Sequence, residues 1–334
     1  MTPGLPKRLV PVPIRRAAAR FVGDRRAADV DRALAALARE RRPIVVGPWL
    51  GEVGFELLYW VPFVRWFAER YAIDPGRLVV VSRGGAAAWY APVAVRSHDV
   101  LGFMPPDAFR AGNDERNRRS GEQKQLAIAP FDEEILAAVR RAEGRDVAVL
   151  HPSLMYRVFA PYWWGHRQAE WVHRRTRFRR LEMPAAGIEL PPRFTAVKFY
   201  FNDCFRNTPD NRAFVARTVR RLQAQGPVVS LSTGVLLDDH APCDPDDDAL
   251  RGIRDRLAPE NNLLVQSAVV ARAERFVGTY GGFAYLAPFY GVPSESYYTE
   301  PGGFSMRHLE LARDALARTP GSGPLGSLPV SMQE

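Results

Sequence analysis

The sequence is poor in cysteine and contains no long apolar run. Its two cysteines, Cys204 and Cys243, match no metal-ligand spacing and do not require a disulfide. No uninterrupted apolar stretch approaches the roughly 20 residues of a transmembrane helix, which excludes an integral membrane protein. The first residues are basic but lack an apolar segment followed by a small-residue cleavage site, so a secretory signal peptide is not expected. These absences together predict a cytoplasmic protein.

Lysine is also scarce, although the chain is basic. The net charge is +9, and only Lys7, Lys124 and Lys198 are lysines, so arginine carries almost all of the positive charge. A positive balance favours acidic partners such as nucleotide phosphates, anionic lipid or nucleic acid. An arginine bias can also reflect genome composition, and no helix-turn-helix or RNA-binding signature is present. We therefore do not expect nucleic acid as a partner.

The motif of dinucleotide-dependent oxidoreductases is missing as well. The first buried strand is followed by GPWLGEVG rather than by G-x-G-x-x-G, and no acidic residue ends the second strand at Val81-Ser82. An enzyme of that class is therefore disfavoured.

What the chain does contain is two successive series of alternating strands and helices. At 334 residues and 46% hydrophobic content it can bury two cores. The first series has strands at 43–47, 78–81 and 147–150, helices at 52–71 and 131–142, and an exposed loop at 103–125. The second has strands at 194–201, 228–231, 263–265 and 275–278, and helices at 211–225, 246–257, 267–274, 283–290 and 305–318. Such alternation predicts an α/β fold with parallel sheets.

Composition also suggests where the parts of the chain begin and end. Residues 1–42 form an N-terminal arm and an Ala/Arg-rich helix at 24–42. Leu190-Pro191-Pro192 is the best linker candidate, which gives an N-terminal domain at 43–190 and a C-terminal domain at 191–318. Residues 319–334 are expected to be a flexible tail.

Two glycine loops stand in front of helices, one in each series. In the C-terminal series, Gly281-Gly282 precedes a helix with apolar residues at helical spacing. In the N-terminal series, the loop runs from Gly51 to Gly54. Backbone N–H groups at the positive end of a helix dipole form a site for phosphate or diphosphate. A tight turn is the alternative for the same sequence feature.

A segment rich in aromatic residues and arginine lies at 156–180. It carries seven arginines and two histidines among its tyrosines, tryptophans and phenylalanines. Stacking rings with basic groups suit a sugar acceptor, a diphosphate or a membrane surface. Packing between domains is the equal alternative.

Two stretches carry a resemblance to a known family. NLLVQSAVVARAERFVGTYGGFAYLAPFYGVPS, at 262–294, resembles the donor-binding end of GT-B glycosyltransferases, and GPWLGEVGFELLYWVPFVRW, at 47–66, resembles the acceptor-side loop of bacterial polysaccharide-type members. The resemblance covers about residues 42–317. It implies two Rossmann-like domains facing each other across a cleft, with the acceptor on the N-terminal domain and a nucleotide-sugar donor on the C-terminal one. It also implies no bound metal and no cofactor beyond the substrate; Asp246-Asp247-Asp248 is interpreted as charge at a helix N-terminus.

The implied reaction moves a sugar from a nucleotide-diphosphate donor to a hydroxyl acceptor. A leaving diphosphate needs positive charge and N–H donors. These are expected from the N–H groups of Gly281, Gly282 and Phe283, with a cation beside them. The other residues expected to bind the donor are Thr279, Lys198, Arg206, Thr233, Gln266 and Ser267.

The acceptor hydroxyl must lose a proton to a base. Glu52, in the N-terminal glycine loop, is the first candidate. Glu56 lies one turn further and is expected on the same face. His151, at the carboxyl end of a strand, is the third candidate. A carboxylate base suits direct displacement, so inversion of the anomeric configuration is preferred.

Two other functions stay open. A nucleotide-sugar epimerase on the same architecture would convert the donor with no acceptor present. A non-catalytic nucleotide or glycan-binding protein would bind without turnover. For the transferase, the acceptor is expected to be a glycan, a lipid-linked sugar or a small molecule, with peripheral contact at the inner face of the membrane as a further expectation.

Overall fold

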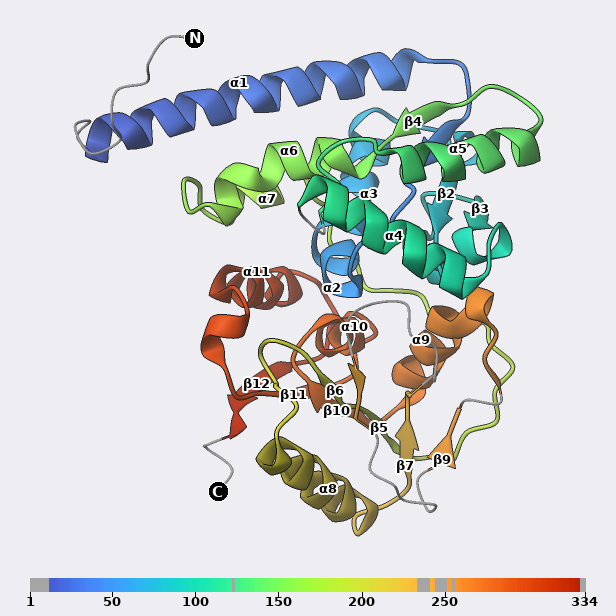
Figure 1. Ribbon diagram of the computed structural model, residues 1–334, viewed down its shortest axis with the longest axis vertical. Helices are drawn as coiled ribbons and strands as arrows, with labels where there is room; N and C mark the ends of the chain where they lie inside the picture. The colour runs from blue at the N-terminus through green and yellow to red at the C-terminus, as the bar shows by residue number, and fades with distance from the viewer. Residues whose placement is uncertain (1–11, 122–123, 233–240, 244–250, 254–255, 331–334) are drawn as a thin grey trace.

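The structure is a computed structural model that describes residues 12–121, 124–232, 241–243, 251–253 and 256–330. Figure 1 shows two α/β units, one above the other, with the N-terminal unit lying beneath the long helix α1 (Val12–Arg39). In the part of the chain described, no helix combines the length and apolarity needed to cross a bilayer.

The N-terminal unit is built on a parallel sheet of four strands. They are β1 (Ile44–Val46), β2 (Leu78–Ser82), β3 (Arg96–Asp99) and β4 (Ala148–Leu150), in the spatial order β3-β2-β1-β4. All residues of β1 and β2 are buried, as expected of apolar β-branched runs covered on both faces.

The C-terminal unit has a parallel sheet of six strands. They are β5 (Thr195–Lys198), β7 (Val228–Ser230), β9 (Arg251–Gly252), β10 (Arg275–Thr279), β11 (Ser294–Tyr298) and β12 (Leu325–Pro329), in the order β12-β11-β10-β5-β7-β9. Numbered along the chain, both sheets follow the doubly wound order in which the first strand lies between the second and the fourth. The predicted α/β class with two Rossmann-like units is therefore confirmed. A short antiparallel pair, β6 (Tyr200–Phe201) and β8 (Ala241–Pro242), stands beside the second sheet.

Helices cover both sheets. In the N-terminal unit they are α2 (Val53–Phe55), a π-helical segment (Glu56–Trp60), α3 (Val61–Arg70), α4 (Pro106–Ser120), α5 (Pro130–Glu143), α6 (Pro152–Trp163) and α7 (Glu170–His173). In the C-terminal unit they are α8 (Pro209–Gln223), α9 (Asn262–Arg272), α10 (Gly282–Phe289) and α11 (Met306–Ala317). One large apolar cluster includes Trp60 and Trp89 of the first unit and Val269 and Ala287 of the second, so the core continues across the boundary.

The helix predicted at 52–71 is present but changes its hydrogen-bond pattern. Its middle turn is π-helical, and the Val61 N–H group bonds to the carbonyl of Glu56, five residues back. Pro62 follows directly and has no N–H group to donate, so an uninterrupted α-helical ladder cannot pass this point.

The exposed loop predicted at 103–125 is wrong, because most of it forms α4. Ion pairs at helical spacing join Arg110 to Asp114 and Glu115 to Arg119. Gly112 leaves the space that the ring of Phe131 occupies, where a Cβ atom would lie 2.3 Å from the ring. The polar composition therefore belongs to a surface helix that packs through a small residue.

Four more expectations need correction. The strand at 263–265 and the helix at 267–274 are a single helix, α9, because a three-residue apolar run cannot by itself distinguish a strand from a buried helix. The tail at 319–334 is not flexible throughout, since β12 pairs with β11 along five residues. Strand β3 was not expected, because its sequence, RSHD, is polar. Within the helix predicted at 246–257, Arg251–Gly252 is instead strand β9, and residues 246–250 and 254–255 lie outside the described residues.

Candidate functional site

The two glycine loops meet at the boundary between the units. The loop after β1 leads into α2, and the loop after β10 leads into α10. A Cβ atom on Gly282 would lie 2.7 Å from the amide nitrogen of Gly54 and 2.8 Å from the Cβ of Val53. The carboxyl ends of the two sheets therefore face each other, and the loops from Gly51 to Gly54 and at Gly281-Gly282 come together. Ligands of open α/β sheets bind at such ends.

A second contact joins the loop after β2 to the start of α9. The carbonyl of Gly84 accepts from the N–H groups of Leu263, at 2.7 Å, and Leu264, at 3.0 Å. The indole N–H of Trp89 donates to the hydroxyl of Ser267 at 3.0 Å. Ser267 is fully buried by this contact, so its hydroxyl joins the two units rather than standing open to a nucleotide.

Three of the residues predicted for donor binding form one cluster. Lys198 ends β5, and its ammonium group bonds to the side-chain oxygen of Gln266 and lies 3.9 Å from the centre of the Phe283 ring. Gln266 is buried within α9, and its amide also donates to the carbonyl of Asn262 at 3.1 Å. Strands β5 and β10 are neighbours at the point where strand order reverses. The cluster thus lies at the topological switch point of the sheet.

The start of α10 is shaped by a glycine that a larger residue would strain. Gly281 has φ +156°, and a Cβ atom there would lie 1.9 Å from the hydroxyl of Tyr200. Gly281 has no side chain to accept from the first N–H groups of the helix, and the first turn of a helix leaves such groups without intrahelical partners. The N-terminus of α10 therefore presents the positive end of the helix dipole together with backbone N–H donors.

Thr279, also predicted for the donor, is engaged elsewhere. The hydroxyl of Thr279 donates to the carbonyl of Tyr200 at 2.9 Å and accepts from the Tyr200 N–H at 3.0 Å, which ties β10 to β6. This hydroxyl is not available to a phosphate. The side chain of Arg206 is exposed in the loop before α8. Thr233 lies outside the described residues.

The two candidate carboxylates do not share a face. Glu52 is exposed at the N-cap of α2, where its backbone is extended, while Glu56 is fully buried. One Glu56 oxygen accepts from the hydroxyls of Ser82, at 2.8 Å, and Tyr90, at 2.7 Å. Burial raises the pKa of Glu56 to about 7, although the nearby charge of Arg83, at 3.9 Å, opposes the shift. Glu56 therefore faces the interior, and Glu52 alone points outward.

His151 is a satisfied interior histidine. It caps α6, and its Nδ1 accepts from the backbone N–H of Ser153 at 3.2 Å, while its Nε2 lies 3.3 Å from a carboxylate oxygen of Asp132. Burial alone would raise the pKa of Asp132, but hydrogen bonds from His151 and from backbone N–H groups lower it below its usual value. Both ring nitrogens have hydrogen-bond partners and 2% of the residue surface is exposed, so His151 has a structural role and does not face a substrate.

Sequence analysis missed His308. It lies on α11, and its Nδ1 is 2.6 Å from the hydroxyl of Tyr59 in the π-helical segment. Burial, and secondarily the charge of Lys124, lowers the pKa of His308 to about 4. Its ring meets Phe55 edge-on, with centroids 4.9 Å apart. No local pattern marks this pair, because 249 positions separate the two residues.

Most of the rings of the aromatic segment at 156–180 pack in the protein interior. Tyr156, Phe159 and Tyr162 are buried, and Tyr156 stacks on Trp49 with centroids 6.1 Å apart. Trp164, in contrast, is 62% exposed.

Within the ranges that the structure describes, no group of three or more His, Cys, Asp or Glu side chains is placed to hold a metal ion. Metal independence itself stays a prediction.

No family model matches the sequence, and no curated protein matches it. Among solved structures, the chain is similar to the dodecameric iron-containing heptosyltransferase TibC of enterotoxigenic E. coli, with 13% identity and a TM-score of 0.41 over 78% of this chain and 59% of that one. It is similar to a family 9 glycosyl transferase from Veillonella parvula, with 10% identity, a TM-score of 0.43, and 88% and 87% of the chains covered. It is also similar to the E. coli ADP-heptose LPS heptosyltransferase II, with 12% identity, a TM-score of 0.42, and 83% and 99% covered. The chain thus spans less than two thirds of the length of TibC.

Proposed function

We propose that this protein is a glycosyltransferase of the GT-B type, which moves a sugar from a nucleotide-diphosphate donor to a hydroxyl acceptor. The observation that carries the proposal is the meeting of the two glycine loops at Gly54 and Gly282, beside the cluster of Lys198, Gln266 and Phe283. Two sheets that face each other at their carboxyl ends can hold two substrates in one place.

In this proposal the diphosphate lies at the N-terminus of α10. Negative charge grows on the diphosphate as the sugar leaves, and the helix dipole together with the ammonium of Lys198 would stabilise it. Gln266 orients that ammonium through its side-chain oxygen. This arrangement would supply positive charge without a metal ion.

Glu52 is the proposed base. It is the exposed carboxylate of the N-terminal glycine loop, two residues before Gly54. A base on the acceptor side can take the proton of the attacking hydroxyl on the face opposite the leaving group, which would invert the anomeric centre. Because Gly54 covers the first turn of α10, the two loops must separate to admit the donor.

Calorimetric titration with UDP, GDP, dTDP, ADP and CMP, in the presence of a chelator, tests the proposal. We expect one nucleoside diphosphate to bind. Lys198→Met, which removes the charge but keeps an unbranched side chain, should weaken that binding by roughly tenfold or more. Arg217→Gln removes a positive charge from an exposed position on α8 and is the matched control. Absence of binding at millimolar nucleotide, or equal binding by the Lys198→Met protein, would rule the donor site out.

The chemical step needs its own measurement. With the nucleotide identified, release of free nucleotide from the corresponding nucleotide sugar reports transfer to acceptor or water. Glu52→Gln should leave nucleotide binding intact and lower the rate of release about a hundredfold or more. Conversion of the donor sugar without nucleotide release would instead identify an epimerase.

A further inference from the structure

Asn262, the first residue of α9, is buried between the two units and uses both ends of its side-chain amide. Its backbone carbonyl accepts from Nε2 of Gln266 at 3.1 Å, and its side-chain Oδ1 accepts from the same nitrogen at 3.3 Å. Its Nδ2 donates to the carbonyl of Pro259 at 2.6 Å. Asn262 therefore presents two oxygens to Gln266 and is itself anchored to the turn before α9.

The two oxygens of Asn262 determine which way the amide of Gln266 points. A glutamine amide has one oxygen and one NH₂ group. In the structure Oε1 of Gln266 accepts from the ammonium of Lys198, while Nε2 donates to Asn262. A reversed amide would aim NH₂ at the ammonium and oxygen at two other oxygens. Because Gln266 is buried, water could not relieve that mismatch, so Asn262 selects the orientation that Lys198 requires.

The loop after β2 of the N-terminal unit lies directly against the side chain of Asn262. A Cβ atom on Gly84 would stand 2.6 Å from Nδ2 and 3.3 Å from Oδ1 of Asn262, and Gly84 has φ +62°, a value that favours glycine. The carbonyl of Gly84 also accepts from the N–H groups of Leu263 and Leu264, the next two residues of α9. The N-terminal unit therefore limits where the amide of Asn262 can move.

We propose that Asn262 is a positioning residue of the donor site. It fixes the amide of Gln266 so that the ammonium of Lys198 stays beside the ring of Phe283 in the first turn of α10, and Gly84 of the N-terminal unit keeps Asn262 in place. This inference rests on the proposed function, in which Lys198 is the cation for the leaving diphosphate. A group held in place before the ligand arrives loses less freedom on binding. The acceptor-side unit thus contributes to binding of the donor.

NMR spectra of the full chain with ¹³C-labelled lysine test the positioning without any ligand. The chain has only three lysines, and Lys198→Met identifies the signal of Lys198. The ammonium of Lys198 lies 3.9 Å from the centre of the Phe283 ring, so ring-current shielding should move its Hε signals upfield. In Asn262→Ala these signals should return toward the position of an exposed lysine, while those of Lys7 and Lys124 stay where they are.

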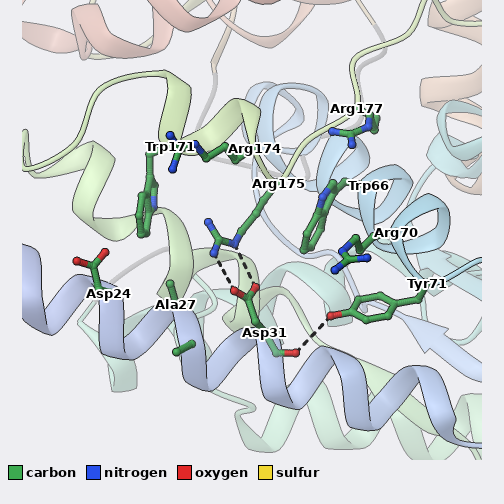
Figure 2. A pocket seen from close by; sticks show the side chains of 11 residues that line it. Asp24, Ala27, Asp31, Trp66, Arg70, Tyr71, Trp171, Arg174, Arg175 and Arg177 are labelled. Atoms are coloured by element: carbon green, nitrogen blue, oxygen red, sulfur yellow. Dashed lines mark hydrogen bonds and ion pairs between the residues drawn. The ribbon is translucent and has the colours of Figure 1, made fainter.

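Three further variants separate a loss of positioning from a loss of stability. Asn262→Leu is similar in size to the wild type but lacks Oδ1, and it should act as Asn262→Ala does. Asn261→Ala removes the neighbouring amide, whose oxygen accepts from the N–H of Ala258 at 2.8 Å. Tyr71→Phe removes a bond to the carbonyl of Asp31 at 3.3 Å, a dashed line in the pocket of Figure 2, which no residue of the donor cluster lines. The last two should leave the Lys198 signal unchanged.

Nucleotide affinity tests whether Asn262 acts through Gln266. For the nucleoside diphosphate that binds, Asn262→Ala should weaken binding about threefold or more, and Gln266→Met at least as much. In the Gln266→Met background, Asn262→Ala should weaken binding no further, because the group that it positions is gone. Additive losses would overturn the inference, since Asn262 would then act on the site independently of Gln266.

Gly84→Ala tests the contribution of the N-terminal unit. The added methyl group must displace the amide of Asn262, so the Lys198 signal should move although the substitution lies in the other unit. A signal unchanged in Asn262→Ala would overturn the positioning role, and one unchanged in Gly84→Ala would overturn the part assigned to the N-terminal unit. Absence of nucleotide binding by the wild-type chain would instead overturn the proposed donor site, so the two failures are distinguishable.

Discussion

The hydroxyl of Tyr59 and the Nδ1 of His308 lie 2.6 Å apart, so a hydrogen bond joins the π-helical segment of the N-terminal unit to α11. Helix α11 follows β11 in the chain, yet a second of its residues, Asp314, pairs with His173 of α7 at 2.5 Å. The last helix therefore bridges back to the first unit.

Tyr59→Phe removes the hydroxyl and leaves a buried ring nitrogen of His308 without its partner. Such a loss costs about 1–3 kcal/mol of unfolding free energy. Urea denaturation followed by tryptophan fluorescence would measure it. Tyr298→Phe is the matched control, because the Tyr298 hydroxyl makes no hydrogen bond to a described residue. Equal stability of the two variants would contradict a stabilising role for the pair.

Stability should fall in acid because of His308. Its pKa is about 4 in the folded chain and 6.5 ordinarily, so between these pH values the unfolded chain binds a proton that the folded chain does not. The contribution is fully present above pH 6.5 and is lost as the pH falls to 4, by about 3 kcal/mol in total. Unfolding free energies of wild type and His308→Gln, measured across this window, should differ in slope. Parallel curves would contradict the shift.

The contribution of Glu56 to stability changes with pH in the opposite direction. Its pKa is about 7 in the folded chain against the ordinary 4.5, so in this window the folded chain binds the extra proton. Its contribution is fully present below pH 4.5 and is lost as the pH rises through 7, by about 3 kcal/mol. Glu56→Gln keeps an oxygen for Ser82 and Tyr90 and should be more stable than wild type at pH 8. A less stable variant would show that Arg83 requires the ionised carboxylate.

Gly282→Ala tests the contact between the glycine loops. The added methyl group would lie 2.7 Å from the amide nitrogen of Gly54, so the two loops must move apart. Overpacking of this kind costs about 1–3 kcal/mol. Gly302→Ala, where a Cβ meets nothing within 4 Å, is the control. A melting temperature equal to that of the control would show that the loops are not in contact in solution.

The bond from Trp89 to Ser267 should couple the two units energetically. A double-mutant cycle of Trp89→Phe and Ser267→Ala isolates the pair, and we expect a coupling of about 0.5–1.5 kcal/mol in chemical denaturation. Additive single-variant effects would mean that the 3.0 Å bond contributes nothing to the association of the units.

Much of the fold could be predicted from local patterns. The buried runs IVV at 44–46 and LVVV at 78–81 are strands, and the glycine pair at 281–282 precedes a helix, because each feature depends on residues within one or two turns. The polar stretch that forms α4 was missed because the features that stabilise it are not visible in its composition. Its packing depends on Phe131, which lies outside the stretch, and its polar composition concealed ion pairs at helical spacing such as Glu115 to Arg119.

The residues predicted for the site also fall into two groups, those that lie near the meeting of the sheets and those that are buried elsewhere. Lys198, expected to bind the donor, ends β5 and lies beside Gln266 and Phe283, two other residues with the same expectation. Glu56 was chosen because it follows a glycine loop, and His151 because it stands at a strand end. Both are instead buried and hydrogen-bonded inside the N-terminal unit. A carboxylate or an imidazole has the same sequence context whether it faces solvent or the core.

The sequence by itself determined the α/β alternation, the two glycine loops and the excess of arginine, since these are properties of neighbouring residues. Only the tertiary structure decided that Gly54 meets Gly282, that His308 and Glu56 have shifted pKa values, and that Asn262 lies against Gly84. Contact and desolvation are set by side chains that the fold brings together from distant positions, and no local pattern encodes that proximity.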